Sequence, residues 1–238
     1  MAGINAHNAV TEKEPLVLGR NQAYIGVLID DLINKGTDEP YRMFTSRAEF
    51  RTLLRQDNAD MRLTGLGYEM GLASQQRMDL LAAKKEAVAN IQKKLAEIRM
   101  APDEVNSFLE AHNSAPIQER TKLEKILLRP GIHLSSLIAE LPALNIALSG
   151  YRQLEIEQAE IQTKYGTYIQ KEQDIAAKMQ DLESLAIPES FDYHGIVALG
   201  TEAKQKLTQV KPRTLGQASR ISGVNPTDVQ ILMVYMGR

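Results

Sequence analysis

Arginine and aromatic side chains lie close together along one stretch of this chain, in a pattern suited to nucleic-acid binding. Between residues 41 and 62, five arginines accompany three acids, with Tyr41 and Phe44 among them. A guanidinium group binds a phosphate through paired hydrogen bonds, and an aromatic ring can stack on a base. The alternative is a helix whose arginines pair with neighbouring acids. The candidate RNA-binding residues are Arg42, Arg47, Arg51 and Arg55.

A second basic stretch lies near the C-terminus and leads into an apolar segment. Residues 203–227 contain no acid and five cations, namely Lys204, Lys206, Lys211, Arg213 and Arg220. Residues 229–236 are almost uniformly apolar, and such a helix must be buried in its own domain or against a partner. The net charge of −2 and the acidic residues 146–187 favour, by composition alone, ordinary solvated helix faces.

The sequence contains no self-contained catalytic, cofactor-binding or metal-binding motif. Without cysteine the chain has no disulfide framework, thiol nucleophile or cysteine-based zinc site. It lacks the G-x-G-x-x-G and G-x-x-x-x-G-K-[ST] phosphate loops and the G-x-S-x-G nucleophile elbow. The histidines are widely separated and have no carboxylate at ligand spacing: His7, His112, His133 and His194. No apolar run approaches the ~20 residues of a membrane span, and no signal-peptide pattern is present, so we expect a cytoplasmic protein.

Hydrophobic periodicity predicts a mainly α-helical chain that positions these residues. Aromatics make up 5% of the chain, so its core must come from aliphatic side chains and methionine, which favour helices. Ser46 and Glu49 have the spacing of a capping box, which predicts a helix from Ser46 to about Arg55. Phe50 and Leu54 would lie on its buried face, with the arginines on the opposite side.

Two long helices are predicted over residues 74–99 and about 145–185, and together they suggest an antiparallel pair. The first has apolar residues at heptad-like spacing from Leu81 to Ile98. The second has an apolar seam of Leu154, Ile161, Tyr165, Tyr168, Ile175, Met179 and Leu182, with the polar residues Gln158 and Glu172 on the same seam. Short helices are predicted at 102–112, 120–128 and 133–141, the last ended by Pro142. Three more follow at 201–207, 214–221 and from the Asn225 cap onward.

Several segments resemble one known family. The carrying motifs are EPYRMFTSRAEFR (39–51), PLVLGR (15–20), AYIGVLIDDL (23–32), LRPG (128–131) and LGQASRISGV (215–224). They resemble stretches of the MnmG (GidA) family, with Phe50 where tyrosine is common. The similarity extends over essentially the whole chain.

The resemblance implies a C-terminal part of a flavin-dependent enzyme that modifies carbon 5 of the tRNA wobble uridine. Residues 1–71 would be a junction from a missing FAD-binding domain, 72–200 a helical domain with two long helices, and 201–238 a small helical subdomain. FAD and NADH would bind the full-length protein and not this chain. The partners would be tRNA, the GTPase MnmE and a second copy of the full-length protein. The family's tRNA-binding arginines correspond to Arg42 and Arg51.

The C-terminal stretch suggests where the partner protein docks. A basic rim around an apolar centre would speed encounter and supply affinity. The candidate partner-binding residues are Lys204, Lys206, Arg213, Arg220, Leu232 and Met236. One alternative is a free-standing helical adaptor without an RNA role. Another is a DNA-binding helix-turn-helix at 214–236, whose second helix has few base-reading side chains.

Overall fold

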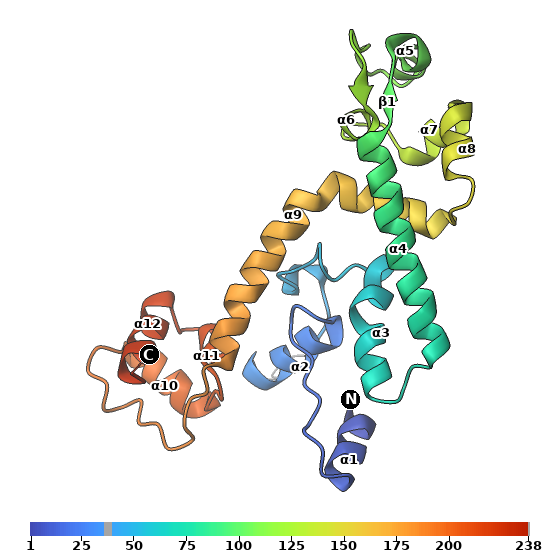
Figure 1. The fold of residues 1–238 in the computed structure, drawn as a ribbon. Coiled ribbons are helices and arrows are strands. Elements are labelled where there is room, and N and C mark those ends of the chain that lie inside the picture. The colour runs from blue at the N-terminus through green and yellow to red at the C-terminus, as the bar shows by residue number, and fades with distance from the viewer. Residues whose placement is uncertain (36–39, 238) are drawn as a thin grey trace. The chain divides into compact units, whose positions relative to one another are not determined.

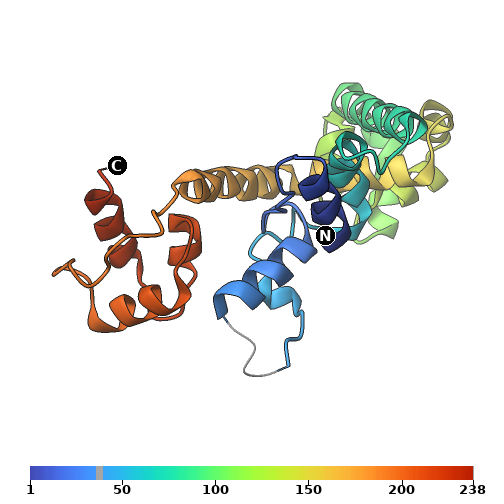
Figure 2. The same cartoon turned by 90° about the horizontal axis from the view of Figure 1, so that it is seen from below.

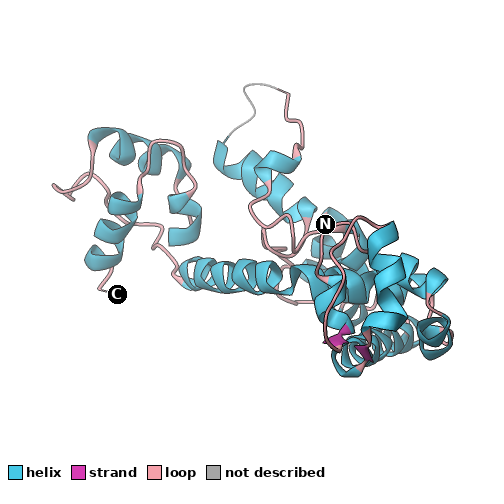
Figure 3. Cartoon of the chain, turned by 90° about the horizontal axis from the view of Figure 1, so that it is seen from above, coloured by secondary structure: helices cyan, strands magenta, loops and turns pink. Residues whose placement is uncertain are grey.

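The described part of the chain is mainly helical (Figures 1 and 3), which confirms the predicted mainly-α fold class. A computed structural model describes residues 1–35 and 40–237. Gly36, which stands where the sequence predicts the end of a helix, and Asp38–Glu39, which it predicts to be extended or in a turn, lie outside the described residues. In the described part, no helix is long and apolar enough to cross a membrane. The elements are α1 Ala2–Val10, α2 Tyr24–Lys35, η1 Thr45–Arg47, η2 Gln56–Asn58, α3 Ala59–Glu69, α4 Gln75–Glu97, β1 Arg99–Met100, α5 Pro102–Ala111, β2 Thr121–Lys122, α6 Leu123–Leu127, α7 Leu134–Glu140, α8 Pro142–Leu148, α9 Gln153–Ser184, α10 Thr201–Val210, α11 Leu215–Ser219 and α12 Pro226–Tyr235.

The chain forms two compact units. The first joins residues 1–54 to residues 170–238, and the second comprises residues 55–169. Helix α9 contributes its N-terminal half to the second unit and its C-terminal half to the first.

In the second unit, α4 confirms the first predicted long helix. The Ser74 hydroxyl accepts a hydrogen bond from the Arg77 amide and caps its N-terminus. One stripe of α4, including Val88, Ile91 and Leu95, is buried in the main core of this unit. Helix α4 packs against α3 and α6. Helix α9 joins the same core through Ile156 and Ala159, but the lengthwise neighbour of α4 is α3 (Figure 1).

Three element boundaries in this unit differ from the predictions. The antiparallel pair β1–β2, with Arg99 opposite Lys122, occupies the start of the predicted helix at 120–128. Helix α7 ends at Glu140, before Pro142 as predicted, but Pro142 also begins an unpredicted helix, α8, because proline needs no N–H partner in a first turn. The second long helix begins at Gln153, and residues 145–148 belong to α8.

The predicted apolar seam of α9 is wrong. Leu154, Tyr165, Tyr168 and Ile175 are exposed, Tyr168 by 63%. Gln158, a polar position of the seam, is buried, but the other side chains that α9 buries lie off the seam: Ile156, Ala159, Ala176 and Glu155. The heptad spacing is present in the sequence, but the side chains that α9 buries lie mostly on another face of the helix.

In the first unit, the predicted helix from Ser46 to Arg55 is also wrong. A single 3₁₀ turn, η1, is followed by extended backbone at Ala48, with φ −96° and ψ 115°. The Glu49 carboxylate does not return to Ser46 but binds the guanidinium of Arg20. Phe50 and Leu54 are nevertheless buried, and Ala48 and Leu54 pack with Val27 in a small core.

Helices α10, α11 and α12 form a small bundle (Figure 2). The Asn225 side chain accepts from the Asp228 amide and Asp228 reciprocates, which confirms the predicted cap. The core of the bundle draws on all three helices through Leu207, Leu215 and Leu232. Because α12 buries only one side, Val234 and Tyr235 remain exposed.

Candidate functional site

The exposed centre of the arginine-rich segment is formed by Arg42 and Phe44. The Arg42 guanidinium carbon lies 5.4 Å from the centre of the Phe44 ring. Phe44 is 50% exposed, and Arg42 is exposed and has no salt bridge within the described residues. A cation over an aromatic face costs neither group its access to solvent, so both can still meet a ligand.

Arg51 has the same freedom. It is exposed, and across residues 1–35 and 40–237 it forms no salt bridge. Its sequence neighbours are not available as partners, because Glu49 binds Arg20 and Asp57 binds Arg55. The alternative in which Arg51 pairs with those acids therefore finds no support in the structure.

Arg47 and Arg55, by contrast, are held in place by other groups. The Arg47 guanidinium stacks 4.7 Å above the Tyr41 ring, and its Nη1 lies 3.6 Å from Asp31 Oδ2. The Tyr41 hydroxyl donates to the same oxygen at 2.9 Å. Burial and this hydrogen bond raise the pKa of Tyr41. Arg55 lies in the other unit, where its Nε donates to Asp57 at 3.1 Å.

Arg20 is the hub that positions this surface. Its guanidinium is 6% exposed and contacts Asp30 at 2.9 Å, Asp31 at 2.8 Å and Glu49 at 2.8 Å. Nη2 also donates to the carbonyl oxygen of Arg47 at 2.9 Å. Burial alone would lower the pKa of Arg20, but the hydrogen bonds that it donates to Glu49 and Asp31 raise that pKa above its ordinary value. Sequence reasoning missed this role, since Arg20 carries no local signal beyond the PLVLGR resemblance.

The same network reaches the C-terminal bundle through Arg220. Its Nε and Nη2 donate to the two carboxylate oxygens of Asp30, each at 2.8 Å, and its Nη1 binds Glu183. Asp30 is thereby shared between Arg20 and Arg220. Burial would lower the pKa of Arg220, but the bonds to Asp30 and Glu183 raise it.

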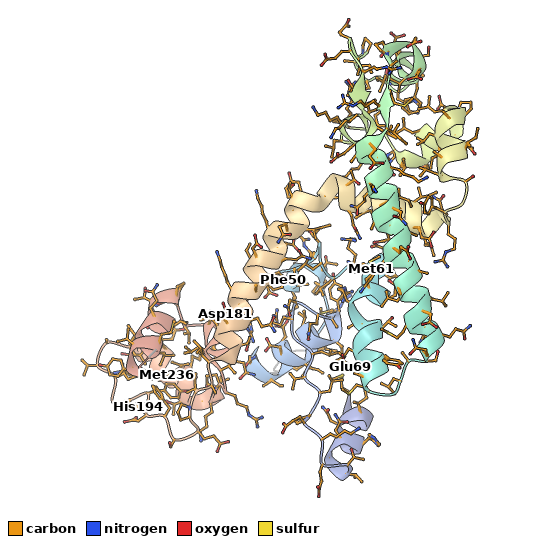
Figure 4. The ribbon with its side chains drawn as sticks, in the orientation of Figure 1. Phe50, Met61, Glu69, Asp181, His194 and Met236 are labelled. Atoms are coloured by element: carbon orange, nitrogen blue, oxygen red, sulfur yellow. The ribbon has the colours of Figure 1, made fainter. Side chains whose placement is uncertain are left out.

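The structure therefore separates the predicted partner-binding residues. Arg220 is 10% exposed and fully engaged, and Leu232 is buried in the core of the bundle, so neither can present itself to a partner in this conformation. Lys206 and Arg213 are exposed, and Lys204 is half-buried. Met236 packs partly against the core of the bundle (Figure 4).

The histidines lie at separate places in the described part of the chain. His133 contacts Glu160 at 3.0 Å and His112 lies 3.6 Å from Glu140. Within the described residues, no group of three or more side chains could hold a metal ion.

Comparison with known proteins first defines the class. Residues 75–173 match the model of the "tRNA modifying enzyme MnmG/GidA C-terminal helical domain", and residues 175–238 match that of the "C-terminal helical bundle" of the same enzyme. Both models describe the C-terminal region of one class of tRNA-modifying enzyme, and together they span most of the chain. The chain is a member of the MnmG/GidA family, of which it represents the C-terminal part.

Individual relatives agree over the full chain. It is 52% identical over 238 residues to the tRNA uridine 5-carboxymethylaminomethyl modification enzyme MnmG of Cytophaga hutchinsonii. It is 53% identical over 239 residues to that of Flavobacterium psychrophilum. In both cases the match covers 100% of this chain and 38% of the relative. The form II crystal structure of Aquifex aeolicus GidA matches with a TM-score of 0.76 and 35% identity, over 100% of this chain and 36% of that one.

Proposed function

We propose that this chain is a tRNA-contacting region of a wobble-uridine-modifying enzyme, and that Arg42 and Arg51 bind tRNA phosphates. The observation that carries the proposal is the exposure of both arginines without salt-bridge partners among the described residues. Arg47 and Arg55, by contrast, are engaged in ion pairs with Asp31 and Asp57. Free guanidinium groups beside an exposed aromatic ring suit a phosphate backbone with an unpaired base.

Arg47 and Arg55 take a supporting role in this proposal. Arg47 braces the backbone around Tyr41 and Asp31, so its loss should disturb the shape of the surface. Arg55 stabilises its own unit through Asp57. Replacing either arginine is expected to lower the melting temperature clearly and to reduce tRNA affinity only slightly.

The test compares tRNA binding by Arg42→Ala, Arg51→Ala and the unchanged chain across a salt series. Each change removes one phosphate contact, so affinity should fall about tenfold and the salt slope should flatten by about one unit. Arg77→Ala is the matched control, because Arg77 is exposed on α4 and forms no salt bridge among the described residues. Equal losses in all three variants would show non-specific charge attraction and defeat the proposal.

The flavin and nicotinamide chemistry of the family is assigned, in this proposal, to parts of the relatives that this chain does not span. A dinucleotide phosphate is usually held by a glycine-rich turn between a strand and a helix. The described residues contain only the two-residue strands β1 and β2, and neither precedes such a turn. The residues present do not fit a dinucleotide, so no chemical step is assigned to them.

The proposal extends to MnmE as the protein that meets the C-terminal bundle, with the intact enzyme acting as a cytoplasmic homodimer. Support comes from the exposed apolar end of α12, at Val234 and Tyr235, and from the cations Lys204, Lys206 and Arg213, which form no salt bridge among the described residues. Removing residues 204–238 would be a poor test, because it also removes Arg220 and much of the bundle core.

Point variants test the docking surface instead. Val234→Asp and Tyr235→Ala should weaken co-elution of the intact enzyme with MnmE while leaving its melting temperature nearly unchanged. Lys125→Gln, on α6 in the other unit, is the charge control. Undiminished co-elution of Val234→Asp would remove this surface from consideration.

A further inference from the structure

The C-terminal bundle contains a pocket that the arginine-rich surface does not use. Its volume is about 440 Å³, within the range of about 300–1,000 Å³ typical of small-molecule sites. One wall is the loop of residues 187–194, and the other is the end of α10 with residues 211–213. The polar and aromatic side chains of the lining include Phe191, His194, Thr208, Lys211 and Arg213, with the acids Glu189 and Asp192.

The first wall offers aromatic rings. Phe191 is half-buried and packs edge-on against Tyr193, with ring centres 5.2 Å apart and planes at 60°. Tyr193 is buried, which anchors this pair in the bundle core and raises the pKa of its hydroxyl. His194, labelled in Figure 4, is exposed, and its Nε2 lies 3.2 Å from the Thr208 hydroxyl. Both rings are therefore held in place while keeping surface that a flat ligand can cover.

The second wall offers cations on a constrained backbone. Lys211 and Arg213 are exposed and form no salt bridge within the described residues. Lys211 has φ 51°, in the left-handed region that lysine rarely adopts. Its amide donates to Leu207 at 2.9 Å, and the Ile187 amide donates to the Arg213 carbonyl at 2.8 Å. Lys211 takes this conformation because it is the C-cap of α10, so the helix end holds the backbone that carries its side chain.

The acids restrict which ligand suits the pocket. Asp192 Oδ1 accepts from the His194 amide at 2.9 Å, and Glu189 is exposed. Two acids and two cations leave no net charge, so a simple anion gains little here. A ligand with hydrogen-bond donors on a flat ring and a phosphate at its other end matches every group. Carboxylates accept from base amino groups, rings stack on bases, and Lys and Arg bind phosphate.

We propose that this pocket binds one unstacked nucleotide, with its base against Phe191 and His194 and its phosphate at Lys211 and Arg213. The inference rests on the proposed tRNA function for its RNA source, an unpaired nucleotide of tRNA. A free mononucleotide carries the same chemistry, and the experiment separates the two sources.

The experiment measures fluorescence anisotropy of a labelled single-stranded hexaribonucleotide titrated with the 238-residue chain. The Arg42→Ala/Arg51→Ala background removes the first candidate surface. Phe191→Leu and Lys211→Gly should each weaken binding at least tenfold, whereas Phe191→Tyr should keep it. Lys178→Gln is the matched control, because Lys178 is an exposed cation of α9 that does not line the pocket, and it should change affinity less than twofold.

Lys211→Gly also guards against a folding artefact. Glycine suits a φ of 51°, so this variant should melt at the same temperature as the unchanged chain or higher. A loss of affinity without a loss of stability is a result that a purely structural role would not produce. Because Phe191 borders the core, a loss of affinity in Phe191→Leu supports the proposal only together with the same loss in Lys211→Gly.

Competitors assign the source of the nucleotide. Displacement of the labelled RNA by AMP or UMP shows that the pocket accepts a free mononucleotide, and displacement only by unlabelled oligonucleotide assigns it to RNA. Equal displacement by inorganic phosphate or a polyglutamate peptide of the same charge would overturn the proposal. Unchanged hexanucleotide binding in Phe191→Leu and Lys211→Gly would overturn it too.

The two proposals fail in distinguishable ways. If Arg42→Ala/Arg51→Ala leaves tRNA binding unchanged while the pocket variants lose the hexanucleotide, the pocket stands and the arginine surface falls. If the arginine variants weaken tRNA binding and the pocket variants do nothing, only the pocket is withdrawn.

Discussion

Replacing Arg220 with methionine should destabilise the first unit strongly, although the residue is near the C-terminus. The variant removes a bidentate ion pair to Asp30, with both donor–acceptor distances at 2.8 Å, and the contact with Glu183. Methionine fills much of the same space, so the main effect is loss of charge. Because hydrogen bonds raise the pKa of Arg220, the effect should persist at every pH at which the carboxylates are ionised.

The magnitude follows from which charges lose their partners. Breaking a buried ion pair from one side costs about 3–5 kcal/mol. Here Asp30 keeps Arg20 at 2.9 Å and Asn34 at 2.9 Å, and Glu183 keeps the Thr214 hydroxyl at 2.7 Å. The expected loss is therefore below that range, at about 2–3 kcal/mol. For a chain of this size that corresponds to a fall of about 4 to 12 °C in melting temperature.

Urea unfolding followed by circular dichroism measures this loss, with Lys206→Met as the control. Lys206 is exposed, so its loss should change stability by less than about 0.5 kcal/mol. A double-mutant cycle with Asp30→Asn should yield a coupling energy of at least about 1 kcal/mol. An Arg220→Met variant no less stable than Lys206→Met, or a coupling near zero, would refute the view that the ion pair holds the bundle to residues 1–54.

Three further predictions concern other parts of the chain. Burial alone would raise the pKa of Glu160, but hydrogen bonds from Lys164 at 2.7 Å and the Leu134 amide at 2.8 Å lower it below 4.5. A carboxyl group whose pKa is lower in the folded state stabilises the fold at pH values above its unfolded pKa, and this contribution is lost as the pH falls through its folded pKa. Glu160→Gln should therefore flatten the acid limb of a curve of stability against pH, and an unchanged limb would contradict this. Gly26→Ala should cost about 1–3 kcal/mol in urea unfolding, because a Cβ would lie 2.5 Å from the Leu18 carbonyl oxygen, and a neutral effect would show that this approach relaxes freely. The purified chain should remain colourless after incubation with FAD and gel filtration, and a stoichiometric yellow complex would overturn the assignment of the flavin to the rest of the enzyme.

The sequence alone determined the features that depend on a few neighbouring residues. Helix α5 begins at Pro102, the first residue of its predicted range, and Asn225 caps the start of α12 together with Asp228. Each depends on groups within one helical turn, so spacing is sufficient to predict it. The family resemblance likewise required only the order of motifs along the chain.

Tertiary structure decided which faces are buried and which charges are free. The seam of α9 satisfied a heptad pattern, yet Tyr168 on that seam is exposed and Ile156 off it is buried. A period specifies that one face is apolar but not which neighbour will cover it. The fold likewise chose the partner of Glu49, since a buried guanidinium 29 residues away binds the carboxylate that local spacing assigned to a cap.

The fate of Arg220 depends most fully on the fold. Its neighbours in sequence are basic, so the sequence predicts a solvent-exposed cation. Its partner Asp30 is 190 residues away and gives no local signal. Whether an arginine is free to bind a ligand depends on the acids that folding brings within about 4 Å, where Coulomb attraction at reduced dielectric becomes strong. The sequence contains the charged residues but not the distances between them. Only the folded chain therefore shows that Arg42 and Arg51 are exposed whereas Arg220 is held in ion pairs.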